Sequence, residues 1–195
     1  VSGGAATYRI PIYVAPGRNQ VQPDISLNYS SGAGNGIMGV GWSLAASSSI
    51  SRCAPILANG DLSRSVDYNE QWDRLCLDGH RLKAVTGDYG RDGTVYRTEL
   101  DTFSRVTQFG NINDNSTYFI VEMKSGFVAT YGGEPLSRQS AAGRDEILNW
   151  RISHKQDRSG NSIHYTYQHH GDGEYTLRTI NYTGYGTVRG DRRVE

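Results

Sequence analysis

The chain lacks a long hydrophobic run, an excess of charge of either sign, and all but two cysteines. No stretch of about 18 apolar residues occurs, so a transmembrane helix is not expected. Lysine plus arginine and aspartate plus glutamate both number 20, so no global field attracts nucleic acid or an anionic membrane. The sequence therefore predicts neither a nucleic-acid partner nor a membrane span.

Two cysteines are too few for a disulfide framework, and they do not form a CxxC pair. A bond between Cys53 and Cys76 would close a loop of about two dozen residues and add roughly 3 kcal/mol of stability in the chain-entropy model. The other possibility is that both are reduced, partly buried thiols, and the sequence alone favours it.

Glycine and tyrosine are what the chain has in quantity. Its 24 glycines and 13 tyrosines far exceed its 4 phenylalanines and 2 methionines, a composition typical of strands and turns with amphipathic faces. Short alternating segments recur along the whole chain, and little helical periodicity is visible beyond one turn at residues 69–75. We therefore predict an all-β fold of antiparallel strands and hairpins that form a curved sheet or strip.

Residues 31–41 read SGAGNGIMGVG, the densest glycine run in the chain. No Gly-Lys-Ser/Thr follows, so this is not a P-loop, and no helix follows that would make it a dinucleotide fingerprint. The glycines are interpreted as conformational, serving positive φ or close backbone approach. The run either turns a corner or lies beneath another strand. The structural glycines are Gly32, Gly34, Gly36, Gly39 and Gly41.

Turn signals organise the rest. Pro11 interrupts an alternating strand at residues 7–14 and places it at a sheet edge, because proline has no amide to donate. Asp78-Gly79 between two alternating segments predicts a type I′ hairpin. A second strand–turn–strand unit has its turn at residues 157–161, where Gly160 and Asn161 are the structural residues.

Three stretches carry a family resemblance. The first, GAATYRIPIYVAPGRNQVQPDISLNYSSGAGNGIMGVGWSL from Gly4, closely resembles the N-terminal domain named for the Salmonella virulence plasmid B protein. That domain also opens the B subunits of insecticidal toxin complexes and many Rhs-type proteins. The second is Arg52-Cys53 with residues 74–82, RLCLDGHRL. The third, WRISHKQDRSGNSIHYTY from Trp150, is similar to the strand–turn–strand unit of Rhs/YD-repeat shells.

The resemblance implies a secreted or cell-surface toxin component that forms part of a hollow β-shell around a toxic effector. Its partners would be the remaining shell segments, or a partner toxin subunit, and the enclosed effector. The chain would be one domain of a longer protein. It divides into a glycine-rich opening segment (1–58), a hairpin region (59–145) and Rhs-like repeats (146–195). Nothing in it resembles the ADP-ribosyltransferase or the self-cleaving aspartyl protease of related proteins, and no cofactor is implied.

Chemical alternatives are weaker. His154, His164, His169 and His170, with Asp172 and Glu174, are the one cluster of metal-ligand types, but adjacent histidines on a strand point to opposite faces. No spacing organises a catalytic triad, so we expect a non-enzyme with no metal.

The tryptophans allow two interpretations. Trp42, Trp72 and Trp150 either form a stacking platform for sugars or fill the core with each N–H bonded to backbone, and packing is favoured. A structural shell module is thus the main hypothesis. A carbohydrate- or protein-binding β-module at the cell surface is the alternative.

Overall fold

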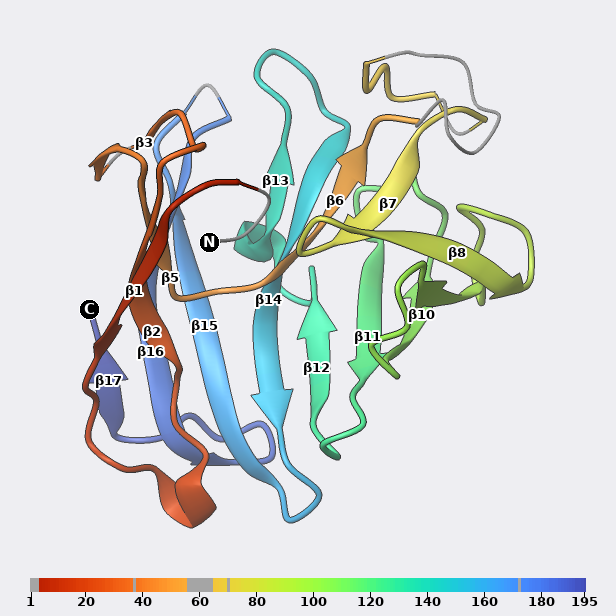
Figure 1. Ribbon diagram of the computed structural model, residues 1–195. Helices are drawn as coiled ribbons and strands as arrows, with labels where there is room; N and C mark the ends of the chain where they lie inside the picture. Colours follow the sequence, from red (N-terminus) through yellow and green to blue (C-terminus); the bar gives the residue numbers. More distant parts are fainter. Residues whose placement is uncertain (1–3, 37, 56–64, 70, 172) are drawn as a thin grey trace.

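The computed structural model of the protein describes residues 4–36, 38–55, 65–69, 71–171 and 173–195 (Figure 1). Its regular structure is almost wholly β, and every strand pairing in that part of the chain is antiparallel. This confirms the all-β prediction. Two short 3-10 turns, η1 (Arg18–Gln20) and η3 (Pro135–Ser137), were not foreseen. The turn expected at 69–75 is an isolated one, closed by Asp73 N donating to Asn69 O at 2.9 Å.

A closed barrel of eight antiparallel strands forms the centre of the molecule. Seven of its strands follow one another in sequence order, and the eighth, β14, closes the ring by pairing with both β6 and β12. Such closure removes the free edges that a flat sheet would leave. The strands are β6 (Ser49–Cys53), β7 (Arg74–Leu77), β8 (His80–Thr86), β9 (Val95–Thr98), β10 (Arg105–Phe109), β11 (Tyr118–Glu122), β12 (Val128–Tyr131) and β14 (Ile147–Gln156).

Strand β14 also belongs to an outer sheet. Its first half pairs with β6 and with β13 (Arg138–Ser140), and its second half pairs with β12 and with β15 (Asn161–His169). The sheet then continues through β16 (Tyr175–Tyr185) to the edge strand β17 (Arg192–Val194). The hairpin expected from the third motif is therefore the β14–β15 unit. In its turn the Asp157 carboxylate accepts the backbone N–H groups of Ser159 and Asn161 at 2.9 and 2.8 Å.

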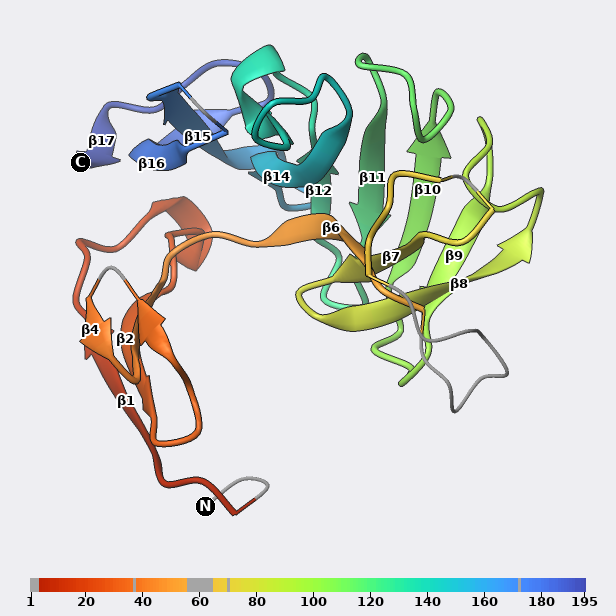
Figure 2. The ribbon, with the colours of Figure 1, turned by 90° about the horizontal axis from the view of Figure 1, so that it is seen from above.

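The N-terminal strands form a separate three-stranded sheet in the order β1 (Thr7–Ile12), β2 (Ile25–Ser30) and β5 (Trp42–Ala45). Figure 2 shows this sheet projecting away from the barrel, to which β6 connects it. Strand β1 lies at one edge, as Pro11 indicated. Strand β6 pairs within the barrel. The expected opening segment, residues 1–58, therefore contributes strands both to this sheet and to the barrel.

The glycine run turns a corner as a small exposed hairpin, with β3 (Asn35–Gly36) paired to β4 (Gly39–Val40). It does not lie beneath another strand. Positive φ occurs at Gly39 and Gly41, and a Cβ on Gly41 would lie 2.6 Å from the Tyr29 ring. Gly36 is also tight, with its Cβ position 3.0 Å from a backbone oxygen, whereas Gly34 meets neither condition. Gly32 does not meet them either, since an added Cβ would lie no closer than 3.4 Å to its nearest neighbour, so positive φ or close approach is found at Gly36, Gly39 and Gly41 but not at Gly32 or Gly34.

The barrel core is packed around Trp150, which is fully buried and meets Phe119 edge-on at a centroid distance of 5.2 Å. Its Nε1 has no hydrogen-bond partner among the described residues, so the expected bond to backbone is not seen there. The indole instead faces the Arg52 guanidinium, which lies 5.8 Å from the ring centroid. Other large and fully buried members of this core are Tyr96, Tyr131, Ile50, Leu75 and Leu82.

Cys53 and Cys76 are joined by a disulfide, which overturns the preference for reduced thiols. Their Cα atoms lie 5.9 Å apart on neighbouring strands β6 and β7, within the range that a disulfide requires. Sequence spacing could not reveal this proximity, because these strands pair across a connection of some 20 residues rather than a short hairpin.

Candidate functional site

Three features outside the packed core are candidates for function: a cavity at the mouth of the barrel, an uncovered face of the three-stranded sheet, and a histidine pair on the outer sheet. A buried charge network lies inside the barrel as well. Among the described residues, no helix has the length and apolar character needed to cross a membrane. No group of three or more metal-ligating side chains occurs among them either.

The charge network centres on Arg52 of β6, whose side chain is wholly buried. Its guanidinium reaches Asp73 Oδ2 at 3.1 Å and donates at 2.8 Å to the carbonyl of Ile147, the carbonyl of Ile112 and Oδ1 of Asn113. A planar fork with five donors is the group that can serve acceptors in so many directions. Arg52 therefore ties β6 to β14 and to two connecting loops. In the sequence, Arg52 stands out only as part of the second family motif.

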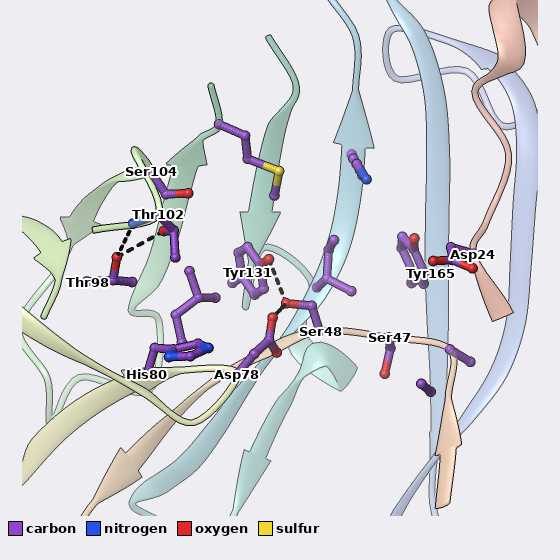
Figure 3. Close-up of a pocket in the computed structure, with 16 residues that line it drawn as sticks. Asp24, Ser47, Ser48, Asp78, His80, Thr98, Thr102, Ser104, Tyr131 and Tyr165 are labelled. Atoms are coloured by element: carbon purple, nitrogen blue, oxygen red, sulfur yellow. Dashed lines mark hydrogen bonds between the residues drawn. The ribbon is translucent and has the colours of Figure 1, made fainter. Parts of the chain in front are cut away.

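The cavity, of about 390 Å³, lies where the linker between β5 and β6 passes the barrel mouth (Figure 3). Barrel residues such as His80, Thr98 and Ser104 line one side, and Lys155 and Tyr165 of the outer sheet line the other. Burial lowers the pKa of Lys155, and Asp24 partly opposes this shift. Hydroxyl, carboxylate and ammonium groups are thus mixed along its walls.

Ser48 holds the linker between β5 and β6 to two residues that line this cavity (Figure 3). Its Oγ donates to Asp78 Oδ2 at 2.6 Å, so the Tyr131 hydroxyl must donate to Ser48 Oγ at 2.8 Å. Asp78 Oδ1 also accepts the backbone N–H of Ser49 at 2.9 Å. Burial above all raises the pKa of Tyr131, which keeps this donor protonated. Because each of these polar atoms is satisfied by another, the arrangement acts as an anchor.

Asp78 therefore does more than the sequence indicated. It and Gly79 both have positive φ, 47° and 81°, as the tight turn between β7 and β8 requires. Its carboxylate in addition holds the linker that leads to the N-terminal sheet. The distance of 30 residues between Ser48 and Asp78 explains why local turn signals missed this second role.

One face of the three-stranded sheet is continuously apolar. The register places Tyr8, Tyr29 and Trp42 side by side, and does the same for Ile10, Leu27 and Leu44. We call these six residues, with Ile12 and Ile25, the apolar face. The opposite face carries the polar residues of the same strands, including the Arg9–Asp24 ion pair at 2.7 Å.

Much of this apolar face is not covered. The exposed fraction is 65 % for Tyr8, 40 % for Ile10 and 46 % for Leu44. Only at one end does it meet the core, where Ile25 is buried together with Val21. The outer strands β1 and β5 also leave backbone groups unpaired along their free edges. Contiguous apolar surface of this kind marks interaction sites in soluble proteins.

The tryptophans do not form a common platform. Trp150 is in the core, Trp42 is half-buried on the apolar face with its ring 5.3 Å from that of Tyr29, and Trp72 is half-buried before β7. Core packing is therefore found for Trp150, although without the expected backbone bond, and only in part for the other two.

The histidine cluster is dispersed. His154 and His164 are cross-strand neighbours with ring centroids 4.6 Å apart. His169 stacks on Tyr175 at 4.5 Å, and His170 bonds to a threonine. Asp172 lies outside the described residues.

One comparison with known proteins identifies a family. The model of the family described as Salmonella virulence plasmid 65kDa B protein matches residues 1–185. A search of the curated proteins found no match.

Solved structures give the same fold. The TcdB2-TccC3-TEV structure matches with a TM-score of 0.77 and 21 % identity over 96 % of this chain and 10 % of that chain. The N-terminal domain of effector protein SpvB from Salmonella typhimurium strain LT2 has a TM-score of 0.71 and 21 % identity over 97 % of this chain and 67 % of that one. For the Photorhabdus luminescens Tc holotoxin pore the TM-score is 0.73, with 22 % identity over 92 % of this chain and 9 % of that one. The chain thus spans about a tenth of the toxin chains it matches.

Proposed function

The chain belongs to the Salmonella virulence plasmid 65kDa B protein family, and from this premise we propose that it is a non-catalytic wall segment of a secreted bacterial toxin. Its task is to help build or cap a β-shell that encloses a toxic effector and delivers it. Its partners are the remaining shell segments, or a partner toxin subunit, and the enclosed effector. We propose further that it acts as one domain and that any enzymatic activity resides elsewhere in the assembly.

The observation that carries this proposal is the uncovered apolar face. A wall segment must present unfinished surfaces to its neighbours, and the three-stranded sheet presents an apolar face together with two free edges. The barrel behind it is closed and disulfide-bonded, so it can hold that sheet in a fixed position. Similarity to structures titled TcdB2-TccC3 and Tc holotoxin pore supports the same role.

Containment gives the physical logic. Apolar side chains on Tyr8, Ile10 and Leu44 lose contact with water when another shell segment covers them, which favours closure by about 25 cal/mol for each Å² buried. A closed wall keeps the effector from proteases and from its target until release. Strands are suited to this because neighbouring segments extend one continuous ladder.

A matched pair of substitutions on β1 tests the proposal. Ile10→Glu places a carboxylate on the apolar face, whereas Thr7→Glu places the same group on the opposite face of the same strand. The whole toxin assembly is digested with protease, and survival of the effector is followed. We expect the effector to be cut at least about tenfold faster in the Ile10→Glu protein, because burying an unpaired carboxylate costs several kcal/mol. Thr7→Glu should resemble the unmodified protein.

The outcomes separate the parts of the proposal. Circular dichroism first establishes that both variants retain the β-fold. Equal effector survival in Ile10→Glu and the unmodified protein would show that the apolar face is not an assembly surface. Equal digestion of the effector with and without residues 1–195 would rule out containment itself.

The alternative role in carbohydrate binding lacks a comparable observation. The three tryptophans form no common stacking platform, because Trp150 is fully buried while Trp42 and Trp72 are half-buried, and the exposed Tyr8 belongs to the apolar face already assigned to assembly. The shell role is therefore the function proposed here.

A further inference from the structure

The histidine pair on the outer sheet lies under the turn that leads to the edge strand β17. His154 of β14 and His164 of β15 are directly opposed in the ladder, with rings 4.6 Å apart and tilted by 52°. His154 Nε2 lies 3.0 Å from the carbonyl oxygen of Gly186. Since a carbonyl can only accept, His154 carries a proton on Nε2 and donates it to this turn.

His164 is held in an environment that suits only its neutral form. Its Nδ1 is buried and has no hydrogen-bond partner in the part of the chain that the structure describes. Burial first, then His154 and Arg189, lower its pKa to about 4, and the backbone of Thr187 opposes the shift. A proton added to His164 would find no acceptor at Nδ1 among the described residues and would face the charge of Arg189.

The surroundings offer one compensating carboxylate. A cavity of about 410 Å³ adjoins the pair and is bordered by Glu134 before η3 and by Arg189 after β16, and Tyr165 also lines it. Burial raises the pKa of Tyr165 to about 12, so it stays neutral. Among the described residues that line the cavity, Glu134 is therefore the one anionic side chain, and the basic side chains there are the two histidines and Arg189.

We propose that the His154–His164 pair is an acid-sensitive latch that holds residues 186–190, and with them strand β17, on the outer sheet. While His164 is uncharged, His154 supports the turn through Gly186 O, and Gly186 also donates from its N–H to Gly160 O at 2.8 Å. When acid protonates His164, repulsion from Arg189 and from the opposed ring drives the turn away. Strand β17 follows, because it is three residues long and pairs only with β16 among the described strands.

The sign and size of the effect follow from linkage. A histidine whose pKa is about 4 in the closed state and about 6.5 when released binds its proton preferentially in the open state. The closed state therefore loses stability as the pH falls from about 6.5 toward 4. The open fraction would rise about 30-fold between pH 7.5 and pH 5. Because the ring is partly exposed, we expect about tenfold.

Hydrogen exchange of the backbone amides tests the latch. Protection of residues 186–194 is compared at about pH 7.5 and pH 5, after correction for the intrinsic pH dependence of exchange, with β9 and β10 of the barrel as internal reference. We expect protection at 186–194 to fall about tenfold while the barrel strands keep theirs. His164→Gln should abolish the fall, and His80→Gln, at an exposed histidine of β8, should leave it intact.

Two results would overturn the proposal. One is an unchanged protection of residues 186–194 in the unmodified protein at about pH 5, and the other is an equal loss in His164→Gln. If that variant does not fold, NMR titration of His164 in the unmodified protein decides: titration near pH 6.5 with no change at Gly186 refutes the latch. These readouts do not depend on an effector or a shell, so they are separate from the containment test.

Discussion

Replacing Arg52 with methionine removes a guanidinium from the core while keeping a side chain of similar reach. The Asp73 carboxylate, whose side chain is fully buried, then has no cation, and breaking a buried pair in this way costs about 3–5 kcal/mol. The carbonyls of Ile147 and Ile112 also lose their donor, at about 1–3 kcal/mol for each that stays dry. We expect a loss of about 5 kcal/mol, of the order of the whole stability of a domain.

Urea unfolding followed by circular dichroism measures this loss. The matched control is Arg105→Met on β10, where the ion pair with Glu122 spans 3.6 Å and both side chains are about half exposed. Such surface pairs contribute about 0–1 kcal/mol, so the control should unfold almost as the unmodified protein does. Equal unfolding midpoints for the two variants would contradict a central role for Arg52.

A second comparison tests the stated cause. Asp73→Asn alone should destabilise the protein, because it leaves the Arg52 charge buried without a counter-charge. In the Arg52→Met background the same change should instead restore about 2 kcal/mol, because no unpaired charge then remains. If Asp73→Asn destabilises both backgrounds equally, the reasoning from buried charge is refuted.

Three further predictions concern other parts of the molecule. Removing the disulfide with Cys53→Ser and Cys76→Ser should lower the free energy of unfolding by about 3 kcal/mol, and reductant should do the same to the unmodified protein; an unaltered urea midpoint on reduction would contradict this. Gly41→Ala should lower the melting temperature by several degrees because of its φ of 79° and the Tyr29 ring, whereas Gly34→Ala, with open space around it, should be nearly neutral. Burial raises the pKa of Tyr96 to about 12, so its contribution to stability is complete below about pH 10 and is lost as the pH rises through 12; the melting temperature should fall over that range, less so in Tyr96→Phe, and a level profile would refute the assignment.

Short-range signals in the sequence were sufficient for the fold class and for its turns. Asp78-Gly79 specifies its hairpin because positive φ at two successive positions is a local requirement that few residue pairs meet. Pro11 placed β1 at an edge for an equally local reason, its missing amide. Alternation along residues 7–14 indicated strand β1, and the side chains of that pattern become part of the apolar face once the register is known.

What the sequence could not give depends on contacts between distant segments. The barrel closes because Tyr131 of β12 pairs with Ile152 of β14, and no local pattern distinguishes that closure from an open strip. The Cys53–Cys76 bond and the anchor of Ser48 on Asp78 arise from the same tertiary arrangement. An arginine with four buried contacts likewise looks in sequence like any polar position on an alternating strand.

Strand β14 connects the barrel to the outer sheet. One half of it closes the ring with β6, and the other half starts the outer sheet that ends at β17. Trp150, in the first half, is locked in the core beside Arg52, whereas His154, four residues later, contacts the turn before β17. Strand β14 thus runs from the buried core to the turn that the proposed latch holds. Opening of the proposed latch can therefore release β17 from the outer sheet while the barrel that positions the apolar face stays folded.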